Sequence, residues 1–150
     1  MYHQAILVKN TSLILLASVG GAIFQLFGGW DALLKALIIC MAVDYITGIL
    51  VAALGKSNKS ESGRITSSAA ISGIIKKGVV LLVILVVAQL GIGTGTEFIR
   101  DSVILFFIGS EGISIVENAG LLGVPMPAVL QQWFEVLRKK GDKDDHDPRD

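Results

Sequence analysis

Four long apolar stretches constrain this chain more than any other feature of its sequence. They run over about residues 13–29, 32–54, 78–93 and 101–116, and Asp31 is the expected N-cap of the second. A helix needs roughly 20 mostly apolar residues to cross a bilayer, and its backbone must satisfy its own hydrogen bonds there. The sequence therefore predicts an all-α integral membrane protein with four transmembrane helices. Three transmembrane helices are the competing prediction, because acidic residues interrupt or flank the fourth stretch.

The composition agrees with a membrane protein. Of the 150 residues, 52% are hydrophobic and 17% are charged, whereas soluble domains carry about 25% charged residues. The basic residues stand in short clusters beside the apolar stretches rather than along one face, so nucleic acid is not an expected partner.

The residues that usually build catalytic or metal sites are scarce. Cys40 is the single cysteine, and His3 and His146 are the two histidines. A disulfide within the chain or a Cys/His metal cluster is therefore excluded. The segment LVAALGKS at 50–57 ends like a phosphate-binding loop but lacks its first glycine and ends an apolar helix. We expect no catalytic residue, no metal, no cofactor and no enzymatic activity.

The basic residues predict how the chain is oriented in the membrane. Cytoplasmic segments carry an excess of Lys and Arg. With four transmembrane helices and the N terminus inside, Lys35 and Arg100 alone among the 13 basic residues lie on the outer side. We therefore expect both termini on the cytoplasmic side.

The chain divides into three predicted segments. A transmembrane domain covers residues 1–125 and includes a Gly-, Ser- and Lys-rich cytoplasmic loop over 55–77, whose end can form a short helix capped at Ser67 or Ser68. Residues 126–140 follow as an amphipathic helix that either lies on the inner leaflet or packs on a partner protein. Residues 141–150 form a charged tail that we expect to be disordered. The residues expected at the membrane surface are Lys76, Lys77, Trp133, Arg138 and Lys139.

Asp44 is the most unusual residue of the second apolar stretch. An ionised carboxylate at the centre of a transmembrane helix costs about 2.5–3.5 kcal/mol, so it needs a partner, water or an ion. Steps of four residues place it in a row of small or polar residues between Cys40 and Gly48. Such a face either packs the helices of one monomer together, or joins subunits and lines a water-filled lumen. Ser18, Gly21 and Gln25 belong to a similar row in the first stretch.

Glu111 and Glu117 lie in and beside the fourth stretch. Their separation of six positions turns them in different directions on a straight helix, so they do not form a carboxylate pair. Either side chain is expected to meet Lys35 or Arg100, or to lie at the membrane surface. The candidates for a surface between subunits or along a pore are Ser18, Gly21, Gln25, Cys40, Asp44, Thr47, Gly48, Glu111, Glu117 and Asn118.

Three motifs in order make the chain resemble the phage lysis and toxin-secretion holin family over roughly residues 33–137. They are Asp-Tyr-x-Thr-Gly at 44–48, Gly-Ile-x-Lys-Lys at 73–77 and Glu-Gly-x-Ser-Ile-x-Glu-Asn at 111–118. The resemblance implies a homo-oligomer in the bacterial (host) cytoplasmic membrane that abruptly permeabilises the bilayer. It also implies release of an endolysin for host lysis, or of a toxin, and carries over no catalytic residue.

Two other functions compete with this interpretation. An antiholin, which restrains another hole-forming protein, has a similar sequence pattern. A small four-helix proton-coupled exporter would use Asp44 as its proton site. Such exporters place the essential acid in their first helix, whereas the first stretch here contains no acid.

Overall fold

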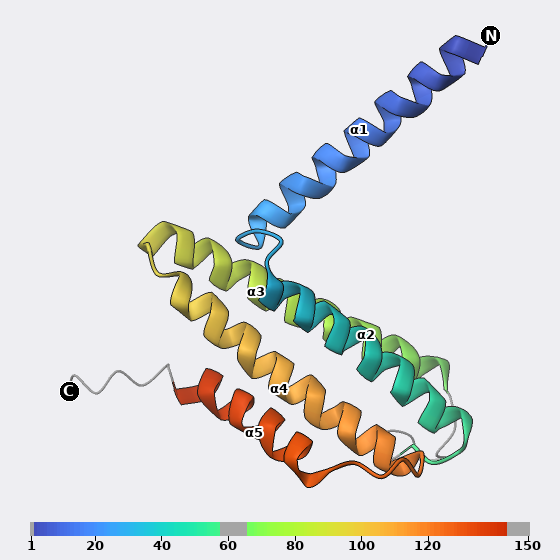
Figure 1. Ribbon diagram of the computed structural model, residues 1–150, viewed down its shortest axis with the longest axis vertical. Coiled ribbons are helices and arrows are strands. Elements are labelled where there is room, and N and C mark those ends of the chain that lie inside the picture. The colour runs from blue at the N-terminus through green and yellow to red at the C-terminus, as the bar shows by residue number, and fades with distance from the viewer. Residues whose placement is uncertain (1, 58–65, 144–150) are drawn as a thin grey trace.

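The computed structural model of the protein describes residues 2–57 and 66–143, and of residues 2–10, 12, 142 and 143 the backbone alone. Within these ranges the fold is all-helical, as predicted, with no strand (Figure 1). The five helices are α1 (Tyr2–Leu26), α2 (Ala32–Ala53), α3 (Ser67–Thr94), α4 (Glu97–Leu121) and α5 (Ala128–Lys143).

Two helices of the described residues, α2 and α3, are long and apolar enough to cross a membrane. The apolar part of α1, Leu13–Leu26, is shorter, and α4 carries charged residues at both ends and in its middle. Length and composition thus support a membrane protein and identify two candidate spans.

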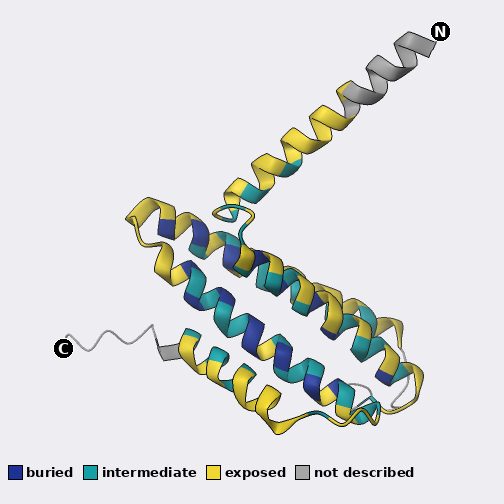
Figure 2. Ribbon diagram, viewed as in Figure 1, coloured by how far each residue is buried: buried dark blue, intermediate teal, exposed yellow. Residues whose placement is uncertain are grey.

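The bundle is built around α4, against which α2, α3 and α5 all pack. Figure 2 shows the buried residues on the sides of α2, α3 and α4 that meet one another. The buried core side chains are Leu34, Leu37 and Met41 of α2, Ile84 of α3, and Ile104 and Ile108 of α4. Most other large apolar side chains of α2 and α3 point outward, as expected for helices that face lipid.

Helix α1 projects away from the bundle, and most of its described side chains are exposed (Figures 1 and 2). Leu16, for example, keeps 70% of its surface exposed. The end of α1 is tied to α3 by Gln89, whose Nε2 donates to the Leu26 carbonyl at 2.6 Å. The apolar surface of α1 is therefore uncovered within one chain.

The starts of α2 and α3 show where the predicted boundaries are right and where they are wrong. Asp31 caps α2, with its Oδ1 accepting from the Leu34 N–H at 2.8 Å, at the position where the second stretch begins. Helix α3 starts after Thr66, whose hydroxyl caps the Ala69 N–H at 3.2 Å, well before residue 78. The segment 67–77 was predicted as the end of a loop, with a short helix capped at Ser67 or Ser68 as its last part. It is helical throughout and continuous with the apolar part of α3, and Thr66 is its capping residue. Residues 58–65 of that loop lie outside the described residues.

Helix α5 lies antiparallel to α4 and very close to it (Figure 1). A Cβ atom at Gly109 would lie 2.6 Å from the Phe134 carbonyl oxygen, and one at Gly112 would overlap the Phe134 ring. Glycines thus create the space into which α5 packs. The sequence led us to expect α5 on the inner leaflet or on another protein, whereas it packs on its own chain. Residues 141–143, predicted as tail, form its last turn, and 144–150 lie outside the described residues.

Candidate functional site

A buried ammonium group joins three helices at the centre of the bundle. The Nζ atom of Lys77 on α3 lies 2.9 Å from Oδ2 of Asp44 on α2 and 2.5 Å from Oε2 of Glu111 on α4. All three side chains are largely buried, with exposed fractions of 17%, 11% and 13%. Charge-assisted hydrogen bonds of this kind are strong, and removing one partner leaves an uncompensated charge.

Asn118 and Thr47 extend these ion pairs into what we call the polar network, comprising Asp44, Thr47, Lys77, Glu111 and Asn118. The Nδ2 atom of Asn118 on α4 donates to Oδ1 of Asp44 at 3.1 Å and to Oγ1 of Thr47 at 3.0 Å. The Thr47 hydroxyl in turn donates to the Val43 carbonyl at 2.9 Å. Both carboxylate oxygens of Asp44 are therefore satisfied within one chain.

Helical spacing explains why these residues meet. Asp44 and Thr47 are three positions apart, and Glu111 and Asn118 are seven apart, so each pair lies on one face of its helix. Glu117 is one residue away from that face and is exposed. The prediction that Glu111 and Glu117 do not form a pair is confirmed, while Lys77, rather than Lys35 or Arg100, is the partner of Glu111.

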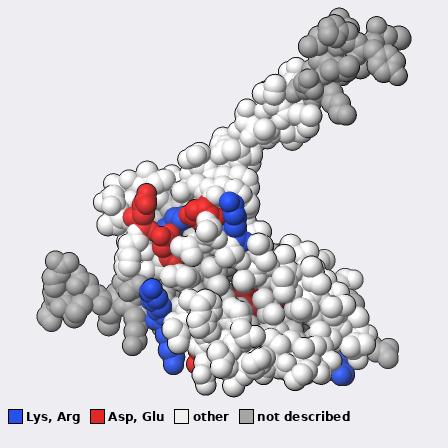
Figure 3. All heavy atoms as spheres, viewed as in Figure 1, with Lys and Arg blue, Asp and Glu red and all other residues white. Residues whose placement is uncertain are grey.

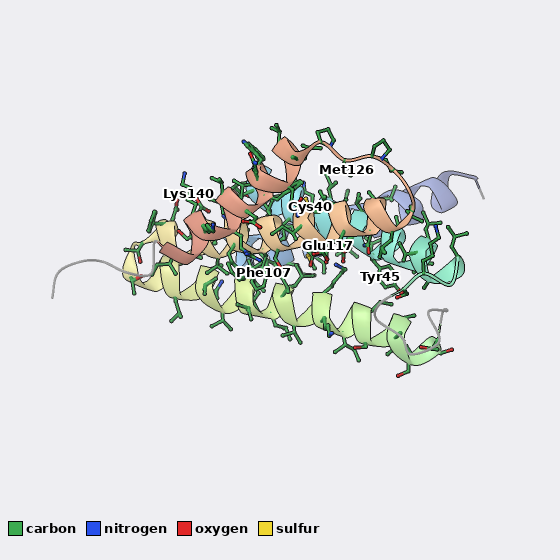
Figure 4. All side chains as sticks on the ribbon, turned by 90° about the horizontal axis from the view of Figure 1, so that it is seen from below. Cys40, Tyr45, Phe107, Glu117, Met126 and Lys140 are labelled. Carbon is green, nitrogen blue, oxygen red and sulfur yellow. The ribbon has the colours of Figure 1, made fainter. Side chains whose placement is uncertain are left out.

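The glycine of the second motif brings α3 close to α2. A Cβ atom at Gly73 would lie 3.3 Å from the ring of Tyr45, which lies on the α3 side of α2 in Figure 4. A Cβ at Gly48 would lie 3.8 Å from Nδ2 of Asn118. The three motifs thus meet in space, although Asp44 of the first and Asn118 of the last are 74 positions apart.

A cavity of about 320 Å³ adjoins the polar network. It lies between the end of α2 and the start of α3, with Ser57 and Thr66 lining it there and Lys77 and Glu111 lining it inside the bundle. Lys76, an exposed residue, also contributes to its wall. Among the described residues no group of acidic, Cys and His side chains is arranged to hold a metal ion.

A second polar cluster ties the α1–α2 connection to the start of α4. The buried Arg100 donates from Nε to the Phe27 carbonyl at 2.6 Å and from Nη1 to Asp31 at 2.5 Å and Asp101 at 2.9 Å. Gly28 has φ +81°, and a Cβ there would lie 2.9 Å from Nε of Arg100. Figure 3 shows charged side chains gathered near the base of α1.

Asp31, at this cluster, has a lowered pKa. Burial raises the pKa of its carboxyl, but hydrogen bonds from Arg100 and the Leu34 N–H, with the charge of Arg100, outweigh that effect. Lys35, one turn into α2, lies 5.7 Å from the centre of the Trp30 ring. Sequence reasoning found Asp31 only as a helix cap and missed its ion pair with Arg100.

The structure separates the remaining candidate residues from the polar network. Ser18, Gly21 and Gln25 lie on the projecting helix α1, where the Ser18 hydroxyl donates to the Ile14 carbonyl at 2.8 Å. Cys40 is half-buried beside the core. On α5, Trp133 and Lys139 are exposed, and Arg138 is half-buried against α4.

Lys77 is the residue for which the position predicted from the sequence differs most from the position in the structure. The adjacent pair Lys76–Lys77 suggested the membrane surface, and the structure leaves Lys76 exposed but buries Lys77. One signal pointed to this role. The apolar parts of α2 and α4 each contain an acid, and Lys77 is the basic residue nearest the apolar part of α3.

Similar proteins occur in bacteria and in a phage. The chain matches the bacteriophage holin family over residues 21–139. An uncharacterized 14.9 kDa protein in the nagH 3' region of Clostridium perfringens is 37% identical, covering 83% of this chain and 91% of the relative. A protein of Bacillus phage phi105 named "Probable holin" is 30% identical, covering 73% of this chain and 77% of the relative. No solved structure is significantly similar.

The matched segment contains every residue of the polar network and both candidate membrane spans. The family consists of proteins that permeabilise membranes and are not enzymes, in agreement with the expectation from the sequence. The chain therefore belongs to the bacteriophage holin family and is not an enzyme.

Proposed function

We propose that this protein is a phage or prophage holin that oligomerises in the bacterial cytoplasmic membrane and permeabilises it. The hole releases an endolysin for host lysis, or a toxin for export. Family membership supports this role. Among the individual residues, the main support is the polar network. Residues from all three motifs that resemble the holin family meet there, between α2, α3 and α4.

The proposed topology has α1 to α4 as four transmembrane helices. The uncovered apolar side chains of α1 favour a lipid environment. The carboxyl group of Glu111 within α4 is compatible with the membrane because it bonds to Lys77 inside the bundle. The distribution of Lys and Arg favours cytoplasmic termini.

A cytoplasmic C terminus places a requirement on α5. Along α4, α5 runs back toward the end of the bundle that holds Arg100, with Gly141 beside Phe106. That end is the outer one in the proposed topology. In the described structure α5 packs on α4, so a cytoplasmic C terminus requires a rearrangement. We propose that α5 separates from α4 in the membrane and lies on the inner leaflet, where the exposed Trp133 and Lys139 and the basic Arg138 would contact lipid headgroups.

The proposed permeabilisation depends on whether the polar network forms its hydrogen bonds within one chain or with water. Inside one chain, the residues of the polar network satisfy one another, which makes the bundle tolerable in lipid. As copies accumulate, mass action favours larger assemblies. We propose that the helices then separate and the polar network faces water, while the row of Ser18, Gly21 and Gln25 on α1 contributes contacts between copies.

Inducible expression in a bacterium, with and without a co-expressed endolysin, tests this function. We expect abrupt loss of membrane potential in both strains and lysis in the strain with the endolysin. A membrane potential that persists at full expression would contradict the proposal. If the protein instead delays lysis by a second, active holin, it is an antiholin.

A further inference from the structure

The polar network contains more negative than positive charge. Asp44 and Glu111 both bond to the single ammonium group of Lys77, while the side chains of Asn118 and Thr47 are neutral. Two ionised carboxylates would therefore leave one uncompensated negative charge between the helices. A buried charge without a partner is strongly unfavourable.

Among the residues that the structure describes, the other ionisable groups around Glu111 do not supply the missing positive charge. Cys40 and Tyr45 of α2 are close to the network but are neutral or acidic groups. Lys76 of α3 lines the adjoining cavity, but it is exposed and forms no ion pair with either carboxylate in the described part of the chain. Asp44 and Glu111 each have one carboxyl oxygen bonded to the same Lys77 nitrogen, at 2.9 and 2.5 Å, so the two carboxyl groups are close neighbours.

The cavity connects this charge imbalance to the end of the bundle at the α2–α3 connection. Its lining includes four hydroxyl-bearing residues and, inside the bundle, Glu111; the four are Ser57, Thr66, Ser72 and Ser114. A water molecule occupies about 30 Å³ in the liquid, so about 320 Å³ holds several waters. Hydroxyl groups and water together form a path along which a proton can move.

We propose that Glu111 and Asp44 form a binding site for one proton, which reaches Glu111 through this cavity. At neutral pH the proton is covalently bound to a carboxyl oxygen of Glu111, and that O–H donates to a carboxylate oxygen of Asp44. Lys77 then faces one negative charge, and the network is neutral. The proton comes from the solution at the α2–α3 connection and returns there when it is released.

Infrared spectroscopy of the full-length protein in detergent micelles at pH 7 tests this proposal. A protonated carboxyl group has a C=O stretch that is separate from the carboxylate bands. We expect this band in the natural protein and its loss in Glu111→Gln. The matched control is Glu117→Gln on the exposed side of α4, which should leave the band unchanged. Transfer to D2O should shift the band promptly, because the cavity gives solvent access to the proton.

Two further variants predict opposite changes in the infrared band, so the test does not depend on the folding of Glu111→Gln alone. Asp44→Asn leaves Lys77 and Glu111 as a neutral pair, so Glu111 should release its proton and the band should disappear. Lys77→Met removes the cation, so both carboxyls should be protonated and the band should roughly double. The far-ultraviolet circular dichroism of each variant establishes that it is folded.

Several results would overturn the proton site. These are a missing band in the natural protein, a band that survives Glu111→Gln, or a band that does not shift in D2O. A band that sodium or potassium chloride abolishes, but choline chloride does not, would assign the site to a metal cation instead. None of these measurements depends on lysis, so a failure here is distinguishable from a failure of the holin function.

Discussion

Lys77 lowers the free-energy cost of burying the carboxyl groups of Asp44 and Glu111 inside the bundle. Its ammonium bonds to carboxylates from two other helices, so it holds α2, α3 and α4 together. The sequence predicted that Asp44 needs a partner, because an isolated carboxylate in a transmembrane helix is costly. It could not identify that partner, since two adjacent lysines look alike until the rotation of α3 against α2 and α4 is known.

Lys77→Met and Lys76→Met should have very different effects on stability. Loss of the buried Lys77 removes the group to which the carboxyl groups of Asp44 and Glu111 both bond, and we expect roughly 3 kcal/mol lower stability. Lys76 is exposed, and its replacement should change stability by less than about 0.5 kcal/mol. Denaturant unfolding of both variants in detergent, followed by circular dichroism, measures the difference. Equal effects would show that Lys77 is not a structural ion-pair partner.

Asp31 gives the protein a specific dependence on acid. Its pKa is lower in the folded protein than in the unfolded chain, so its contribution is fully present above the unfolded pKa of about 3.9. That contribution is lost as the pH falls through the folded pKa. The melting temperature of the natural protein should therefore drop more between pH 5 and strongly acidic conditions than that of Asp31→Asn. Glu97→Gln, at an exposed carboxyl of α4, serves as the control. Parallel melting curves for the natural protein and Asp31→Asn would contradict this role.

The helices follow the sequence most closely where a capping residue adjoins an apolar stretch. Asp31 marks the start of α2 in both the prediction and the structure. Helix α3 begins much earlier than residue 78, because hydropathy identifies where a helix enters lipid and not where it starts. The packing of α5 on α4 was not predictable from the sequence. Glycine has a low helix propensity, so Gly109 and Gly112 alone indicate a less stable helix. Their role becomes visible only in the structure, where α5 fills the space beside them.

Substitutions at two glycines of α4 test the contact with α5. Gly112→Ala introduces a methyl group that overlaps the Phe134 ring, whereas a Cβ at Gly120 meets no other atom. We expect Gly112→Ala to loosen α5 and to increase the rate of tryptic cleavage after Lys139 and Lys140 several-fold. Gly120→Ala should be cleaved at the natural rate. Identical cleavage of the two variants would mean that α5 does not pack on α4 in detergent.

The whole molecule joins a compact bundle to helix α1, most of whose described side chains are exposed. Composition, apolar stretches and motifs were enough to predict an all-helical fold and the family. They did not reveal that Asp44, Lys77 and Glu111 satisfy one another within a single copy, because this depends on the arrangement of three helices. Under the proposed function, this mutual satisfaction of polar groups would allow one copy to remain in lipid before it assembles.

The time at which lysis begins tests most directly whether the polar network controls permeabilisation. Asp44→Ala removes bonds to Lys77 and Asn118, while Val43→Ala changes an exposed neighbour outside the network. At matched protein levels and with the endolysin present, we predict earlier lysis for Asp44→Ala and natural timing for Val43→Ala. Unchanged timing in Asp44→Ala would contradict the account.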